Sequence, residues 1–122
     1  MSVTDTADTA VDNLPERTSS GKLMVICYIT IKPGQEEKFE KMSLDTRLYA
    51  NSDKEPGTLT YRTTRVVGTD GKPVVPAKYV FIEEYSGKSS LLTHTQSPPQ
   101  LEYIKGMEDV MESLTVDIVD EF

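Results

Sequence analysis

Hydrophobic positions in the first half of the chain predict a buried strand followed by an amphipathic helix. Residues 23–31 form a nearly continuous apolar run rich in Ile and Val, which is typical of a short buried strand. The run ends at the turn signal Lys32-Pro33-Gly34. In residues 35–52 apolar side chains recur at helical spacing, and Leu44 and Leu48 widen the apolar side.

Two further segments predict a β-hairpin. Residues 58–67 and 77–86 are rich in Thr, Val and aromatic residues, and a cluster of turn residues separates them. Side chains alternate between the two faces of a strand, so one face of the second segment carries a polar and aromatic row. This row consists of Tyr79, Phe81, Glu83 and Tyr85.

The C-terminal third predicts a short helical turn, a helix and a last strand. The turn covers residues 88–97, and the helix covers residues 100–114 with one apolar stripe. Residues 114–122 alternate like a half-buried strand. The resulting order, β-α-β-β-α-β, predicts a ferredoxin-like α+β fold with a four-stranded antiparallel sheet and both helices on one face.

Composition and charge narrow the classes of function. The chain has 122 residues, enough for one packed core, and its formal net charge is -7. An acidic protein repels phosphate backbones, so we expect no nucleic-acid partner. One cysteine and one histidine cannot form a disulfide framework or a common transition-metal site, so we expect no metal.

The N-terminal residues differ from the rest of the chain. Residues 1–21 are mainly Thr, Asp, Ser and Ala, which predicts a flexible acidic tail before one folded domain at 22–122. These residues lack the apolar segment of a secretion signal, and no stretch has the ~20 apolar residues of a membrane span. We therefore expect a cytoplasmic protein with no membrane partner.

An ordered set of short motifs resembles the antibiotic biosynthesis monooxygenase family. The motifs are ITIKPGQEEKFE, then EPGTLTY, then YVFIEEYSGKSSLLTHTQSP. The resemblance covers about residues 23–119 and implies a dimeric α+β barrel built from two sheets. It also implies oxidation of phenolic or quinol-like aromatics with molecular oxygen and without flavin, haem or metal.

The chain also departs from the family pattern. It contains no Trp, and Glu83-Glu84-Tyr85 stands where the family often has Glu-x-Trp. The haem-degrading branch has an Asn on the first strand and a His on the last helix. Here Cys27 takes the first position, and the last predicted helix has no His, so we expect no haem.

His94 is the only histidine, and its ordinary pKa makes it the best candidate for a catalytic base. Glu83 would orient His94 or a substrate hydroxyl, and Tyr85 occupies the position of the family's Trp. Aromatic and polar side chains suited to a flat phenolic ligand complete the predicted site: Tyr61, Tyr79, Phe81, Asn51 and Arg65. Each has an ordinary structural alternative, such as cross-strand packing for the tyrosines and a salt bridge for Glu83.

These observations favour a homodimeric, cofactor-free monooxygenase that acts on an electron-rich phenol, quinol or polyketide-type aromatic with O2. Two other functions remain open on the same scaffold. One is an isomerase or cyclase that acts on a small polyketide or lactone without oxygen. The other is a dimeric binding protein without catalysis, because a fold alone does not decide function.

Overall fold

A computed structural model describes residues 13–122 and contains one four-stranded antiparallel sheet with three helices. The sheet order is β2-β3-β1-β4, so the first strand lies in the middle. The elements are β1 (Leu23–Ile31), α2 (Glu36–Ala50), β2 (Thr58–Arg65), β3 (Lys78–Tyr85), α3 (Lys88–Thr95), α4 (Pro98–Val110) and β4 (Met111–Val119). The ferredoxin-like α+β fold is thus confirmed, and the short turn expected at 88–97 contains the helix α3.

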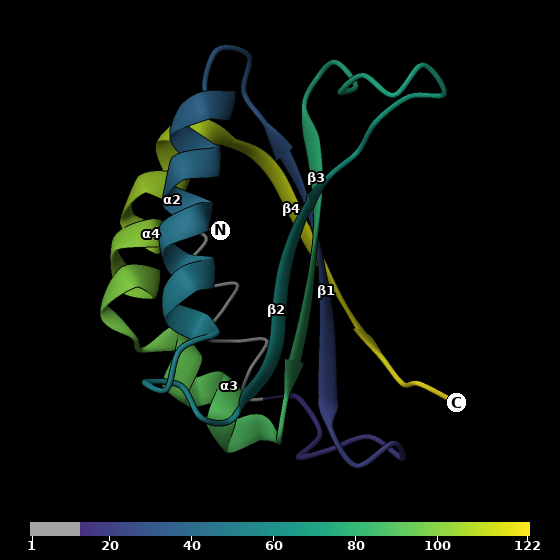
Figure 1. Ribbon diagram of the computed structural model, residues 1–122, viewed down its shortest axis with the longest axis vertical. Helices are drawn as coiled ribbons and strands as arrows, with labels where there is room; N and C mark the ends of the chain where they lie inside the picture. Colours follow the sequence, from purple (N-terminus) through teal and green to yellow (C-terminus); the bar gives the residue numbers. More distant parts are fainter. Residues whose placement is uncertain (1–12) are drawn as a thin grey trace.

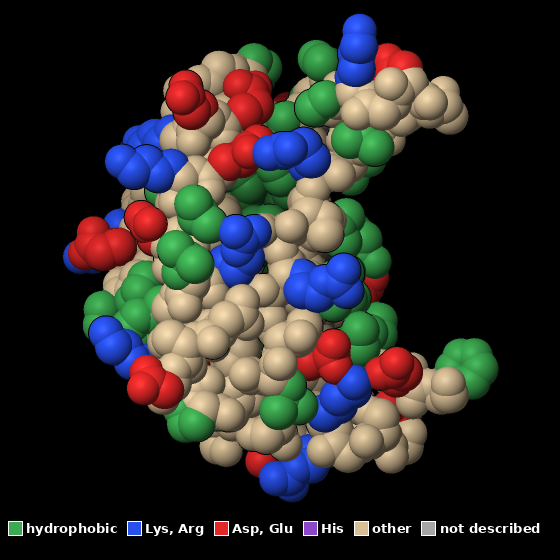
Figure 2. All heavy atoms as spheres, viewed as in Figure 1, with side chains coloured by type: hydrophobic (Ala, Val, Ile, Leu, Met, Phe, Trp, Pro, Cys, Tyr) green, Lys and Arg blue, Asp and Glu red, His purple; other side chains and the backbone are tan. Residues whose placement is uncertain are grey.

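All three helices cover one face of the sheet, and the other face has no layer over it (Figure 1). Figure 2 shows that the molecule is hollowed on this uncovered side. The β2–β3 loop projects beyond one end of the sheet, and the C-terminal residues extend from the other end. The two faces therefore differ in role, since only one of them packs against the chain's own helices.

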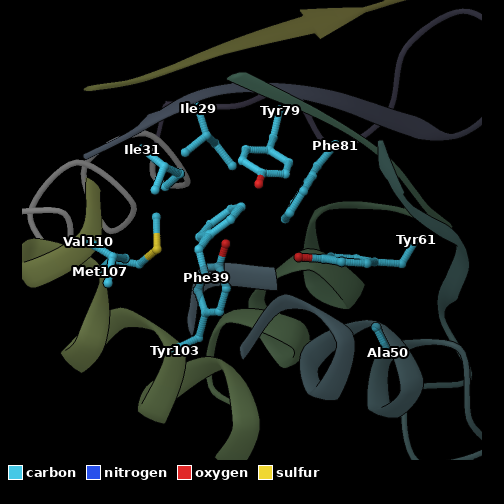
Figure 3. Packing of buried hydrophobic residues seen from close by; sticks show 10 residues of the cluster. All are labelled: Ile29, Ile31, Phe39, Ala50, Tyr61, Tyr79, Phe81, Tyr103, Met107 and Val110. Carbon is cyan, nitrogen blue, oxygen red and sulfur yellow. The ribbon is translucent and has the colours of Figure 1, made fainter. Parts of the chain in front are cut away.

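The main core lies between α2, α4 and the inner face of the sheet. Phe39 of α2 sits at its centre, with ring centroids 4.7 Å from Tyr79, 5.8 Å from Phe81 and 6.1 Å from Tyr103 (Figure 3). A second cluster at the other end of the sheet joins Leu23, Val25, Tyr85 and Leu91. Aromatic contacts of this kind add to the stability from apolar burial.

The prediction for the apolar side of α2 is wrong for two leucines. Leu44 and Leu48 are 41% and 62% exposed, so they do not widen the buried face. The small residues Ser43, Thr46 and Ala50 are buried there beside Phe39. Small side chains are accommodated because α2 packs closely on both the sheet and α4.

The expected last helix is four residues too long. It ends at Val110, and Met111 and Leu114 belong to β4. Met111 pairs with Ile31 and Leu114 pairs with Ile29 in the ladder with β1. The apolar stripe over residues 111–114 is compatible with both a helix and a strand. Pairing with the central strand β1 makes these residues a strand.

Residues 13–22 run past α3 before the chain enters β1 (Figure 1). The Lys88 amide donates to the Glu16 carbonyl at 3.0 Å, and Arg17 Nε donates to the Ser86 carbonyl at 2.9 Å. The rest of the expected flexible tail, residues 1–12, lies outside the described residues. Among residues 13–122, no helix has the length and apolar character needed to cross a membrane.

Candidate functional site

A largely apolar cavity of about 130 Å³ lies between the inner face of the sheet and the helices α3 and α4. Sheet residues Val25, Ile29 and Phe81 form one wall, and Leu91 and Met107 from the helices form another. The polar groups at its surface include Cys27, Tyr61, Glu83, His94 and Tyr103. An apolar cavity with a few converging polar groups is the usual form of a small-molecule site.

His94 lies on α3, lines this cavity, and is 2% exposed. Its Nδ1 is 2.8 Å from Oε1 of Glu55, a carboxylate from the loop between α2 and β2 that is itself 2% exposed. Since an ionised carboxylate only accepts hydrogen bonds, Nδ1 carries a proton and donates it to Glu55. The other ring nitrogen, Nε2, is then the acceptor of the neutral imidazole, as a general base requires.

Glu55 is held in its ionised form by its neighbours. Burial tends to raise its pKa, but the hydrogen bond from His94 Nδ1 and a 2.9 Å hydrogen bond from Thr58 Oγ1 outweigh this effect. The pKa of Glu55 therefore lies below its usual value. A carboxylate in this state stabilises the positive charge that His94 acquires when it takes a proton.

Two tyrosine rings flank His94. The ring centroid of Tyr61 lies 5.1 Å from that of His94, and the Tyr85 centroid lies 5.7 Å away. Burial, with the nearby charge of Glu83, raises the pKa of Tyr61 well above its usual value, so Tyr61 keeps its hydroxyl proton. Tyr61 lines the cavity, which makes its hydroxyl a donor for a ligand oxygen.

Glu83 does not contact His94 directly, and the expected pairing of these two side chains is wrong. Its Oε1 accepts a hydrogen bond from the Tyr85 hydroxyl, and its Oε2 accepts one from the Cys27 thiol at 3.3 Å. Among residues 13–122, Glu83 also forms no salt bridge with Arg62, Arg65 or a lysine, which was the structural alternative. The alternation of side chains between the two faces of β3 does place Glu83 at the cavity wall. The hydrogen-bond partners of Glu83, however, come from β3 itself and from β1.

Tyr85 and Asn51 do not line the cavity. Tyr85 is fully buried, and its pKa is raised well above its usual value by burial and by the charge of Glu83. Asn51 Nδ2 donates to the Tyr61 carbonyl at 3.0 Å, and Asn51 Oδ1 accepts from the Tyr61 amide at 3.1 Å. Asn51 therefore attaches the end of α2 to β2 and does not line the cavity.

Arg65 and Tyr79 lie on a separate groove of about 490 Å³ between α2 and β2. Both contact Glu40: Arg65 forms an ion pair with it, and the Tyr79 hydroxyl donates to it at 2.7 Å. Phe81 lines both the groove and the cavity. The structure thus joins Tyr61, Phe81, Glu83 and His94 at one cavity and separates Arg65 and Tyr79 from it.

Sequence reasoning did not identify the partner of His94. Glu55 stands in the EPGTLTY motif, where the following Pro56-Gly57 indicates a turn. An acidic residue in a turn is usually solvated, so its type alone does not mark it. Within the described part of the chain, no three His, Cys, Asp or Glu side chains are grouped closely enough to hold a metal ion.

Comparisons with known proteins place this fold among solved structures. The PA3566 protein of Pseudomonas aeruginosa is similar over 86% of this chain and 98% of its own, with a TM-score of 0.72 and 20% identity. Rv0793 of Mycobacterium tuberculosis is similar over 83% of this chain and 95% of its own, with a TM-score of 0.68 and 18% identity. SO0527 of Shewanella oneidensis is similar over 88% of this chain and 97% of its own, with a TM-score of 0.69 and 16% identity. At these identities the likeness shows the fold alone.

The family itself is shown by the sequence. No curated protein matches this chain significantly. Residues 22–106, more than half of the chain, match the model of the family described as "Antibiotic biosynthesis monooxygenase". That range contains Glu55, Tyr61, Glu83 and His94. The chain therefore belongs to the antibiotic biosynthesis monooxygenase family.

Proposed function

We propose that this protein oxidises a small electron-rich phenol with molecular oxygen and needs no cofactor for the reaction. The observation that supports this is the buried His94–Glu55 pair at the wall of an apolar cavity. A phenol reacts with oxygen much more readily as its anion. A base inside a dry cavity is therefore the central requirement of the reaction.

His94 and Tyr61 have complementary roles in this proposal. Nε2 of His94 takes the proton of the phenolic hydroxyl, and the resulting imidazolium is stabilised by Glu55 at 2.8 Å. Tyr61, which stays protonated, donates a hydrogen bond to the phenolate oxygen. The nearby Glu83 disfavours an isolated anion, so the phenolate forms only as a pair with protonated His94.

The oxygen step balances without an external reductant. The phenolate transfers one electron to O2, and the two radicals combine into a peroxide anion on a ring carbon. Protonated His94 returns its proton to this anion and so forms the hydroperoxide. The ring carbon then loses its hydrogen as a proton while the O–O bond breaks, so water leaves and a quinone remains. The substrate supplies all the electrons, one oxygen atom enters the quinone, and the other leaves as water.

The size of the cavity favours a single aromatic ring. Its volume is about 130 Å³, and an engineered apolar cavity of about 150 Å³ binds benzene. Typical ligand pockets are larger, about 300–1,000 Å³. We therefore place one-ring phenols ahead of the fused-ring aromatics as substrates.

We also propose that the protein is a homodimer that pairs the uncovered faces of two sheets. Met24, Ile26, Val80 and Ile82 lie on that face, and Tyr28 beside them is 42% exposed. A contiguous apolar face on a soluble domain usually has a partner. A second copy fits this face because the family is generally dimeric.

Oxygen consumption by the purified protein tests the reaction. The one-ring test substrates are methoxyphenols and resorcinols. The fused-ring test substrates are hydroxynaphthalenes and anthrones. We expect uptake above the buffer rate with one-ring phenols, and transfer of label from isotopically labelled O2 into the quinone. His94→Ala should reduce the rate by about 100-fold or more, since a positioned base contributes about 10²–10⁴.

The control and the alternatives belong to the same experiment. Leu92→Ala on α3 changes a side chain that is 37% exposed and outside the cavity, and it should keep the wild-type rate. Equal rates for wild type and His94→Ala would contradict the proposal. A product formed under nitrogen that still depends on His94 would instead identify an isomerase or cyclase.

A further inference from the structure

One wall of the cavity comes from outside the part of the chain that matches the family. Leu14 lines the cavity together with Val25, Leu91 and His94. It is half-buried and packs against the second core cluster, which contains Val25 and Leu91. The family match covers residues 22–106, so Leu14 adds a wall on its N-terminal side, as Met107, Leu114 and Val116 do on its C-terminal side.

The segment that carries Leu14, residues 13–22, is tied to the turn between β3 and α3. The Lys88 amide binds the Glu16 carbonyl at 3.0 Å, and Arg17 Nε binds the Ser86 carbonyl at 2.9 Å. Gly87 lies so close that a Cβ there would be 3.2 Å from Glu16 Oε1. We call residues 13–22 the N-terminal strap.

The other attachments of the strap to the rest of the chain are polar. The Ser20 amide donates to Asp120 Oδ1 at 3.1 Å, and Lys22 forms ion pairs with Glu84 and Glu121. Most of its side chains are exposed, and Leu14 is the hydrophobic side chain that it contributes to the two core clusters. A segment with few buried apolar contacts opens at low free-energy cost. The strap can therefore give way without unfolding of the sheet, whereas the walls from β1, β3 and α4 cannot.

We propose that the N-terminal strap sets the size of the ligand, with Leu14 as the specificity-determining side chain. This inference rests on the proposed function, because it assumes that an aromatic ligand occupies the cavity beside His94. With Leu14 in place, the cavity accepts one ring. Leu14→Ala removes an isopropyl group from the cavity wall and so opens space for a second fused ring.

Binding of phenol and 2-naphthol to Leu14→Ala tests this proposal without any turnover. Phenol is measured by calorimetry, and 2-naphthol is measured by the change in its own fluorescence. We expect the ratio of the phenol to the 2-naphthol dissociation constant to rise on the order of tenfold over wild type, because burial of a second ring adds apolar area. Arg17→Ala, which removes the bond to Ser86, should shift the ratio in the same direction by less.

The matched control is Leu48→Ala, which makes the same chemical change at a side chain that is 62% exposed on α2. It should leave both dissociation constants unchanged, and urea unfolding confirms that each variant is folded. An unchanged ratio in Leu14→Ala overturns the proposal. The proposal is also overturned if neither phenol nor 2-naphthol binds to the wild type, to Leu14→Ala or to Arg17→Ala. If binding shifts as expected but no oxygen is consumed, the strap's role stands and the oxygenase reaction fails.

Discussion

At the scale of single residues, the site depends on buried polar groups that satisfy one another. Glu55 and His94 are both almost fully buried and form a hydrogen-bonded pair. Glu83 accepts hydrogen bonds from Cys27 and Tyr85. Burial and the charge of Glu83 raise the pKa of the Cys27 thiol well above its usual value, so this thiol acts as a donor and not as a nucleophile.

The Glu55–His94 pair predicts a pH-dependent contribution to stability. The folded state holds the Glu55 pKa below its usual value of 4.5, so the folded state binds this proton more weakly than the unfolded state. The ionised form therefore stabilises the fold above about pH 4.5, and this contribution is lost as the pH falls through the lowered folded pKa. Glu55→Gln should reduce the free energy of unfolding by about 1–3 kcal/mol at pH 7 and by much less near pH 3.

Urea unfolding of wild type and Glu55→Gln between pH 3 and 7 measures this difference. Glu40 also has a lowered pKa, but it is present in both proteins and cancels in the comparison. Glu102→Gln, at a side chain that is 75% exposed, is the control and should show little difference at any pH. A Glu55→Gln effect of the same size at every pH would contradict the charged pair.

At the scale of elements, the position of the cavity depends on how α2 and α3 are attached to the sheet. Asn51 binds both the amide and the carbonyl of Tyr61, which holds the C-terminal end of α2 on β2. Glu55 follows in the same connection and reaches His94 on α3. One short segment thus sets the positions of the proposed donor, the proposed base and the partner of that base.

Substitution of Asn51 should loosen this attachment. Asn51→Ala removes both hydrogen bonds to Tyr61, and we expect a loss of about 1–3 kcal/mol in the free energy of unfolding. Asn51→Asp keeps the acceptor for the Tyr61 amide but sets a carboxylate oxygen against the Tyr61 carbonyl, so it should also lose stability at neutral pH. Asp53→Ala in the same exposed turn is the control for urea unfolding, and an equal effect of Asp53→Ala would show that Asn51 has no special role.

At the scale of the whole molecule, the sheet has one face that its own chain covers and one that it does not (Figure 1). The covered face holds the cavity. The uncovered face carries apolar side chains, and charged side chains such as Arg62 and Glu84 lie beside them. This arrangement suits a face-to-face pair of sheets, because the apolar centre is buried and charges fix the register.

Light scattering on the eluted protein tests this assembly. We expect a mass of twice the 13.6 kDa chain at micromolar concentration. Ile82→Lys places a charge at the centre of the uncovered face and should give a monomer, since an unpaired charge is costly to bury. Leu48→Lys on the exposed side of α2 should remain dimeric, and a monomeric wild type would refute the proposed dimer.

Local patterns were sufficient for most of the secondary structure. The apolar run of β1, the hairpin β2–β3 and the helical spacing of α2 follow from neighbouring residues, so the sequence predicts them. The alternation along β3 also determined that Phe81 and Glu83 share a face, which is the cavity wall. The order of the elements then determined the ferredoxin-like fold, because short right-handed connections leave few other arrangements.

Contacts between residues far apart in the chain were decided only by the tertiary structure. Glu55 and His94 are 39 positions apart, and no local pattern pairs an acidic turn residue with a helical histidine. The end of α4 depends on the pairing of β4 with β1, and the assignment of Arg65 and Tyr79 to another groove depends on Glu40 of α2. Sequence patterns report which face of its own element a side chain occupies. The partner on that face is set by how the elements pack, and this packing decided which polar groups meet at the cavity.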